Sequence, residues 1–145
     1  MDVSQIPILN YHKIESQNDI GITSRHPNDF RNDVQFFVAQ GYKTITFLDI
    51  LNGKKIPSKP LILTFDDGYE SVYTQAFPVL KEYNFKAVVF IPSNFIGKYN
   101  DWDVQFGDKK FRHLTAEQLR ILANEGYEIA AHGCSHRPFT KMKTE

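Results

Sequence analysis

The sequence of 145 residues predicts an α/β fold in which helices cover a parallel sheet or barrel. Two observations lead to this prediction. Short apolar runs of strand length alternate with amphipathic patterns of helical period, as they do in parallel α/β folds. Polar and charged residues follow several of these runs directly, at the carboxyl ends of strands where the sites of such folds collect.

The first predicted strand covers residues 6–11, IPILNY, and a polar loop follows it. An amphipathic helix is predicted next, starting near Asn28 or Asp29 and ending before Gly41. Four apolar residues recur within it at helical spacing, and they are Phe30, Val34, Phe37 and Val38.

Two continuous apolar runs follow, LILTF at residues 61–65 and AVVFI at residues 87–91. Runs of this length without polar alternation are typical of strands that are covered on both faces. Pro92 closes the second run. We therefore predict two strands that are each covered on both faces.

The clearest helix signal begins at Thr115, which has the spacing of a capping box with Gln118. Leu114 and Leu119 have the spacing of a hydrophobic staple across the same helix start. Gly126 is expected to end the helix. At the end of the chain, residues 144–145 read as the start of another helix, so the sequence is expected to be cut there.

The last predicted strand covers residues 127–131, YEIAA. Four polar residues then lie at the carboxyl ends of predicted strands: His12, Asp66, Asp67 and His132. Because the carboxyl ends of parallel strands meet at one edge, we expect these side chains to share one rim. Adjacent carboxylates raise each other's pKa, so a cation or hydrogen bonds are expected to compensate the Asp66–Asp67 pair.

The composition argues against several classes of partner. Lys plus Arg and Asp plus Glu number 17 each, which gives no electrostatic indication of nucleic acid or an anionic membrane surface. No apolar stretch approaches the length of a membrane span, and the N-terminus lacks the regions of a signal peptide. The protein is thus expected to be intracellular, or to have had a leader removed. The single cysteine, Cys134, leaves the redox compartment open and is expected to fill space.

A carboxylate and two imidazoles make the three-ligand set of a catalytic zinc site. The motifs DDG at residues 66–68 and HGCSH at residues 132–136 together offer such a set. Taken singly, each motif is more typical of a turn or a solvated loop. A metal would also explain the paired carboxylates, since one Asp would bind it while the other stayed ionised as a general base.

Three segments resemble the polysaccharide deacetylase family, also called the NodB-homology domain or carbohydrate esterase family 4. They are LTFDDGY at 63–69, PVLKEYNFKAVVFIPSNFIG at 78–97 and LTAEQLRILANEGYEIAAHGCSH at 114–136. The segments ILNYHKI at 8–14 and GYKTITFLDIL at 41–51 resemble members that act on poly-N-acetylglucosamine. The resemblance implies that residues 1–145 form a single domain, the N-terminal part of a distorted (β/α) barrel, truncated at its C-terminal end.

The resemblance also assigns roles to residues. It implies that Asp66 is the general base and that Asp67, His132 and His136 bind a divalent metal, with zinc expected. Ser135 would brace the histidine loop. The implied enzyme is a metal-dependent hydrolase that removes N-acetyl groups from a polysaccharide containing N-acetylglucosamine, at an extracellular or cell-envelope location.

Other features of the family are not found in these residues. They are a late arginine, a substrate-groove segment and a late histidine that acts as the general acid. We therefore expect little deacetylase activity from this chain alone. We also expect the chain to self-associate through the uncovered part of its sheet. His12, His26 and His113 are the candidate replacements for the acid, and we expect ordinary structural roles for them, with His12 the best placed. Tyr69 is expected to pack its ring, whereas Trp102 could equally pack in its loop or stack on a sugar.

Two other classes of function stay open. The chain could be a non-catalytic glycan-binding or pseudo-enzyme module that keeps the metal site. It could also be another metal-dependent hydrolase such as a phosphoesterase, because Asp and His ligands do not choose between acyl and phosphoryl substrates. Release of acetate or of phosphate distinguishes these classes.

Overall fold

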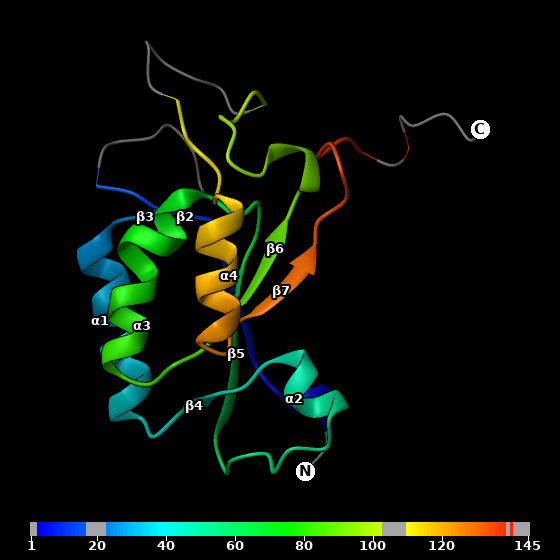
Figure 1. Ribbon diagram of the computed structural model, residues 1–145. Coiled ribbons are helices and arrows are strands. Elements are labelled where there is room, and N and C mark those ends of the chain that lie inside the picture. Colours follow the sequence, from blue (N-terminus) through cyan, green and yellow to red (C-terminus); the bar gives the residue numbers. More distant parts are fainter. Residues whose placement is uncertain (1–2, 17–22, 103–109, 139, 141–145) are drawn as a thin grey trace.

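The computed structural model describes residues 3–16, 23–102, 110–138 and 140. It has the predicted α/β architecture with a parallel sheet (Figure 1). The strand order is β1 (Ile8–Tyr11), β5 (Pro60–Phe65), β6 (Val88–Ile91) and β7 (Glu128–Ala131), and β4 (Lys43–Thr44) pairs with the first residues of β5. Two further short strands, β2 (Lys13–Ile14) and β3 (Ser24–Arg25), form a separate parallel pair.

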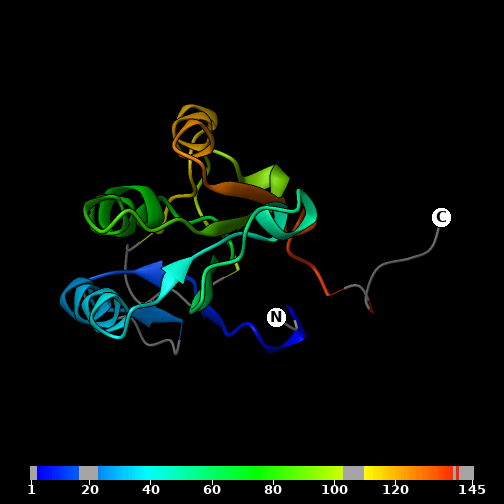
Figure 2. The same cartoon turned by 90° about the horizontal axis from the view of Figure 1, so that it is seen from below.

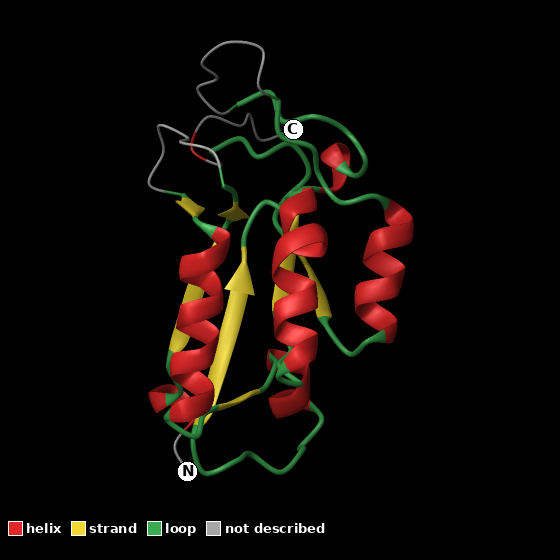
Figure 3. Ribbon diagram, turned by 90° about the vertical axis from the view of Figure 1, so that its left-hand side faces the viewer, coloured by secondary structure: helices red, strands yellow, loops and turns green. Residues whose placement is uncertain are grey.

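Three helices lie side by side on one face of the sheet (Figures 1 and 3). They are α1 (Pro27–Ala39), α3 (Phe77–Glu82) and α4 (Ala116–Asn124). The short helix α2 (Phe47–Leu51) lies on the other side, near the amino ends of the strands (Figure 2). Helical turns occur at η1 (Val3–Gln5), at η2 (Val72–Ala76), which has π geometry, and at η3 (Ser93–Phe95). In the described part of the chain, every helix is too short or too polar to cross a membrane.

Strand β5 is buried along its whole length, as the LILTF run predicts. Leu61, Leu63 and Phe65 belong to the core between sheet and helices, whereas Ile62 belongs to a second cluster on the side of α2. Apolar side chains alternate between two buried faces because successive residues of a strand point in opposite directions. Full burial of each such side chain stabilises the fold by about 1.5–3 kcal/mol. The strand that carries the acidic pair is therefore anchored from both sides.

One predicted helix start is confirmed, and the other lies slightly earlier in the chain than predicted. Thr115 and Gln118 form the predicted capping box, with reciprocal bonds of 3.2 and 2.8 Å between side chain and backbone. The first helix begins at Pro27, slightly earlier than predicted, and the side chain of His26 caps it by accepting a bond from the Asn28 N–H. Helices α2 and α3 were not predicted as elements. Residues 144–145, where a further helix is expected, lie outside the described residues.

Candidate metal centre

Three predicted ligands come together at the carboxyl edge of the sheet. Asp67 follows β5, His132 follows β7, and His136 lies in the loop beyond it. The Asp67 Oδ1 atom lies 3.3 Å from His132 Nε2 and 3.0 Å from His136 Nε2. One ligand atom from each residue lies within 4.8 Å of those of the other two. The cluster therefore has the residue types and the spacing of a three-ligand metal site.

The environment of Asp67 fits a cation. The residue is buried, and its Oδ1 has no hydrogen-bond partner among the described residues. A buried carboxylate oxygen without a partner is costly unless a positive charge compensates it. Both imidazole nitrogens approach this oxygen without forming a hydrogen bond to it. This arrangement suits a metal ion that binds all three residues better than it suits direct hydrogen bonds between the carboxylate and the imidazoles.

The backbone of the DDG turn is tightly fixed. Asp67 and Gly68 have φ angles of +66° and +58°, in the left-handed region that few residues other than glycine adopt. The Leu114 N–H donates to the Gly68 carbonyl at 2.8 Å, and His113 Nδ1 lies 2.7 Å from the Asp67 carbonyl oxygen. A Cβ atom at Gly68 would come within 2.3 Å of Ile91 Cδ1, so only glycine fits there without rearrangement.

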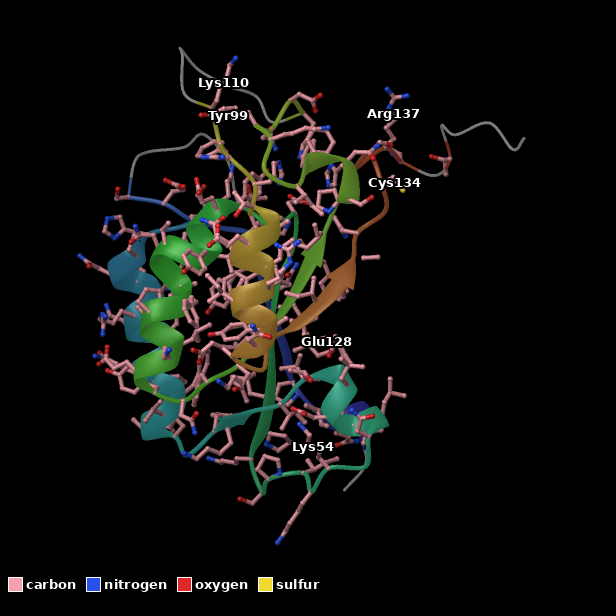
Figure 4. The ribbon with its side chains drawn as sticks, in the orientation of Figure 1. Lys54, Tyr99, Lys110, Glu128, Cys134 and Arg137 are labelled. Carbon is pink, nitrogen blue, oxygen red and sulfur yellow. The ribbon has the colours of Figure 1, made fainter. Side chains whose placement is uncertain are left out.

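The histidine loop is held by backbone bonds to the end of β6 and to η3. The His132 N–H donates to the Ile91 carbonyl at 2.9 Å, and the N–H groups of Ser93 and Asn94 donate to the carbonyls of Gly133 and Cys134 at 3.2 and 3.0 Å. Bracing by Ser135 stays a prediction. The prediction that Cys134 fills space was wrong: the side chain is exposed, and Figure 4 shows it pointing away from the body of the molecule.

Asp66 has different surroundings from Asp67. Its Oδ2 accepts a 2.9 Å hydrogen bond from Asn10 Nδ2, and Asn10 Oδ1 in turn accepts from the Thr64 hydroxyl at 2.8 Å. His12 Nε2 lies 3.9 Å from Asp66 Oδ2. The Asp66 carboxylate is 22% exposed, compared with 7% for Asp67. The structure thus places one carboxylate inside the cluster and orients the other one beside it, open to solvent.

The remaining candidates divide between the site and the core. Tyr69 is buried, and its hydroxyl accepts a 2.8 Å bond from Asn100 Nδ2, so the ring packs in the interior as predicted. His26 lies at the start of α1. His113 is buried against the Asp67 backbone, a role that its sequence neighbourhood does not indicate. The ring of Trp102 stacks on the imidazole of His136, with centroids 4.2 Å apart.

An open cavity of about 450 Å³ adjoins the cluster. Its lining includes His136, Trp102 and Phe95 together with Lys98, Tyr99 and Arg137. Tyr99 and Arg137 lie at the same end of the molecule in Figure 4, far from Lys54 and Glu128. A sugar ring needs both apolar surface and hydrogen-bond donors, and this lining supplies both.

Comparison with protein families gives a match over most of the chain. The family described as polysaccharide deacetylase matches residues 53–145. A Bacillus subtilis (strain 168) protein, YxkH, named as a polysaccharide deacetylase, is 35% identical over 137 residues. That alignment covers 92% of this chain and 44% of the relative.

Poly-beta-1,6-N-acetyl-D-glucosamine N-deacetylase of Escherichia coli (strain K12) is 29% identical over 86% of this chain, but over only 20% of its own length. The chain therefore spans less than half the length of these two relatives. Among solved structures, Streptococcus pyogenes deacetylase PplD in complex with acetate superposes with a TM-score of 0.76 at 23% identity. That superposition covers 95% of this chain and 60% of the other, and it shows a shared fold.

Proposed function

The chain belongs to the polysaccharide deacetylase family, and from this premise we propose that it serves the metal-dependent removal of N-acetyl groups from a polysaccharide containing N-acetylglucosamine. The observation that carries the proposal is the buried Asp67 oxygen, which has no hydrogen-bond partner among the described residues and faces two imidazole nitrogens, one of them from His136 in the lining of an open cavity. The names of the Escherichia coli relative and of Staphylococcus epidermidis and Staphylococcus aureus relatives supply the substrate class.

Asp67, His132 and His136 would hold the metal, and the mixed carboxylate and imidazole set suits zinc. When bound, a zinc ion supplies Lewis acidity towards a carbonyl oxygen and makes water more acidic. The chain itself contributes the geometry. The cavity reaches the cluster at His136, so the acetamido group of a sugar can approach that ligand from there.

Asp66 is proposed as the general base. A base must be ionised, oriented and accessible to the water from which it takes a proton. The bond from Asn10 Nδ2, itself fixed by the Thr64 hydroxyl, orients the Asp66 carboxylate, and its partial exposure leaves it accessible. The separation of roles between the two carboxylates follows from their different surroundings.

We further propose His12 as the proton donor for the leaving amine. Of the three histidines considered for this role, His113 is buried and His26 is used as a helix cap. His12 is 28% exposed and lies 3.9 Å from the Asp66 carboxylate, on the same rim as the cluster. The geometry therefore favours His12, beyond the structural role that the sequence suggests.

The proposed location is extracellular or in the cell envelope, where a polymer too large to be imported would be met. Polysaccharide is the proposed partner, and no membrane-spanning helix is found in the described part of the chain. The neutral overall charge of the chain argues against nucleic acid as a partner. A single domain over residues 1–145 stays a proposal.

The proposal is tested first by metal content, because metal binding does not depend on turnover. Purified protein is expected to hold one zinc ion per chain, and H132A and H136A are expected to lose it. H26A is the matched control, since it removes a histidine outside the cluster. Zinc content in H132A and H136A equal to that of the parent would exclude the assigned site.

Activity is measured as acetate released from N-acetylglucosamine oligomers. H12Q is expected to keep the metal and to slow acetate release by about 10²–10⁴-fold, the usual contribution of a general acid. Phosphate release from a simple phosphoester serves as the comparison. Faster phosphate release than acetate release would support a phosphoesterase and contradict the proposed reaction.

A further inference from the structure

Four aromatic rings form a continuous column beside the metal cluster. Tyr69 and His113 stack with centroids 4.9 Å apart and planes 21° apart. His113 and Trp102 follow at 5.1 Å with their planes tilted by 46°, and Trp102 and His136 stack at 4.2 Å with an interplanar angle of 22°. We call Tyr69, His113, Trp102 and His136 the aromatic column. It ends on a proposed metal ligand.

The second member of the column also contacts the backbone of another proposed ligand. His113 Nδ1 lies 2.7 Å from the carbonyl oxygen of Asp67. Because a carbonyl oxygen only accepts hydrogen bonds, His113 Nδ1 carries a proton and donates it. Asp67 has a φ of +66°, an uncommon conformation that persists only where the surroundings impose it. The His113 bond is one of the contacts that impose it.

Trp102 contacts a second proposed ligand, His136, through ring stacking. His136 also has a positive φ, +52°, and its imidazole is 31% exposed, so burial does not fix the orientation of the ring. The indole covers one face of that imidazole. Phe95 meets the indole edge-on at 4.5 Å, which limits the positions that the indole can adopt.

Asn100 links Tyr69, one end of the column, to the backbone of Trp102. Its side-chain Nδ2 donates to the Tyr69 hydroxyl at 2.8 Å, and its Oδ1 accepts from the Trp102 backbone N–H at 3.1 Å. Both Tyr69 and Asn100 are buried. The ammonium of buried Lys13 lies 5.2 Å from the centre of the Tyr69 ring and adds a cation–π contact at the base of the column. The column is therefore anchored in the core.

We propose that His113 and Trp102 are positioning residues that preset two of the three metal ligands, Asp67 through its backbone and His136 through its ring. The proposal rests on the proposed metal site and adds residues that do not touch the metal themselves. It also assigns Trp102 a role besides lining the cavity, because one face of the indole covers the His136 imidazole. Residues that orient metal ligands typically change metal affinity by about 10–100-fold when removed.

The experiment measures zinc affinity by competition with a chromophoric chelator, together with the visible absorption spectrum of the Co²⁺ form. H113L and W102L remove the bond and the stacked ring. H113N and W102F are conservative partners, because an Asn amide nitrogen takes the place of His Nδ1 and Phe keeps a ring over His136. Y73L is the matched control, since Tyr73 stacks on Phe77 in the helical layer, with centroids 5.6 Å apart, outside the column.

We expect H113L and W102L to bind zinc about 10–100-fold more weakly and to shift the Co²⁺ spectrum, as loss of ligand orientation requires. H113N and W102F are expected to recover most of the affinity. Y73L is expected to lower the melting temperature and leave the affinity unchanged, which separates stability from ligand positioning.

Folded H113L and W102L with parental affinity and spectrum would overturn the proposal. If H113L does not fold, the comparison moves to H113N and H113Q, whose amide nitrogens lie at different distances along the side chain. Equal affinity of H113N and H113Q would then count against the His113 bond. Failure of the parent to bind zinc at all is a different outcome: it would refute the metal site itself, and this inference with it.

Discussion

At the residue scale, the site is built on backbone conformations that most residues avoid. Asp67, Gly68 and His136 all have positive φ angles, between +52° and +66°. Each non-glycine residue in the left-handed region costs about 1–2 kcal/mol, so the surrounding contacts have to stabilise it. Two of the three proposed ligands carry this cost. The cluster therefore depends on its supporting contacts as much as on its ligands.

Gly68 is the position of the DDG turn at which a larger side chain is expected to be tolerated least. G68A would place a Cβ 2.3 Å from Ile91 Cδ1 in addition to adopting a positive φ. We expect a loss of about 2–4 kcal/mol of unfolding free energy, from left-handed strain and overpacking together. Urea unfolding of G68A and the parent measures this difference in unfolding free energy.

G53A is the control, because Gly53 has a φ of +65° but has open space where its Cβ would lie. It is expected to lose only the conformational part, about 1–2 kcal/mol. Equal losses in both variants would show that the contact with Ile91 relaxes without cost.

Asp66 is the residue whose role separates catalysis from metal binding. D66N keeps the size of the side chain and its place beside Asn10 but cannot accept a proton. We expect deacetylation to fall by about 10²–10⁴-fold while zinc content is unchanged. Parallel assays of acetate release and bound zinc check this. Simultaneous loss of metal and activity would argue that Asp66 is itself a ligand.

The residues of the cluster were predictable, but their support was not. Asp66, Asp67, His132 and His136 lie in short motifs directly after strands, so local spacing and the family resemblance both point to them. His113 contacts a carbonyl 46 positions earlier in the chain. Stacking of Trp102 on His136 likewise joins two loops. Such contacts depend on how loops fold over the sheet, which no local pattern encodes.

At the element scale, the sequence predicts the helices that have a strong local signal, either a long apolar period or a capping box with flanking leucines. Helix α4 was predicted because its capping box and flanking leucines are adjacent in the sequence. Helix α3 was not, since its start at Ala76 has no side-chain cap and continues directly from the π turn η2. Helix α2 does have a capping box, between Thr46 and Asp49, but it is too short to show an apolar period. The missed elements are those with weak local signals.

The α2 cap gives a pH-dependent prediction. Burial raises the pKa of Asp49, but hydrogen bonds from Lys54 and Thr46 outweigh it and hold the pKa below its usual value. A carboxyl with a depressed folded-state pKa stabilises the protein above the unfolded-state pKa, about 4, and loses that contribution as the pH falls through the folded-state value. D49A is thus expected to cost about 1 kcal/mol at pH 7 and less at pH 2.5.

Urea unfolding of D49A and the parent at the two pH values measures this difference. E117A serves as the control, because Glu117 is an exposed acidic residue in the first turn of α4 outside its capping box. A D49A penalty as large at pH 2.5 as at pH 7 would show that the Asp49 charge does not contribute to the cap.

At the scale of the whole molecule, the two faces of the sheet are covered unequally. Helices α1, α3 and α4 cover one face, whereas α2 is the only described α-helix on the other and lies near the amino ends of the strands (Figures 1 and 2). The alternation of strand and helix patterns predicted the parallel sheet and the shared rim. The pairing of β4 with β5 was not predicted, because β4 has two residues and no periodic signal.

The face carrying α2 exposes large apolar side chains. Leu48 and Leu51 are 47% and 80% exposed and lie three positions apart, on the same side of α2. Ile8, 54% exposed, pairs in register with Ile62, a member of the cluster on the α2 side. Exposed apolar side chains on one face favour association, since full burial of each is worth about 1.5–3 kcal/mol. A second copy of the chain, which presents the same side chains, would bury them.

We therefore expect the protein to self-associate at high concentration through the face of α2. Light scattering should give a mass that rises with concentration above the 16.8 kDa of one chain. The double variant L48Q/L51K should restore the single-chain mass, because it replaces both exposed leucines without removing a core contact. F36Q is the matched control: Phe36 is 58% exposed but belongs to α1, on the opposite side of the sheet, so its replacement should leave the association unchanged. A parent protein that stays at 16.8 kDa at every concentration would contradict the prediction, and F36Q that alone dissociates the protein would move the interface to α1.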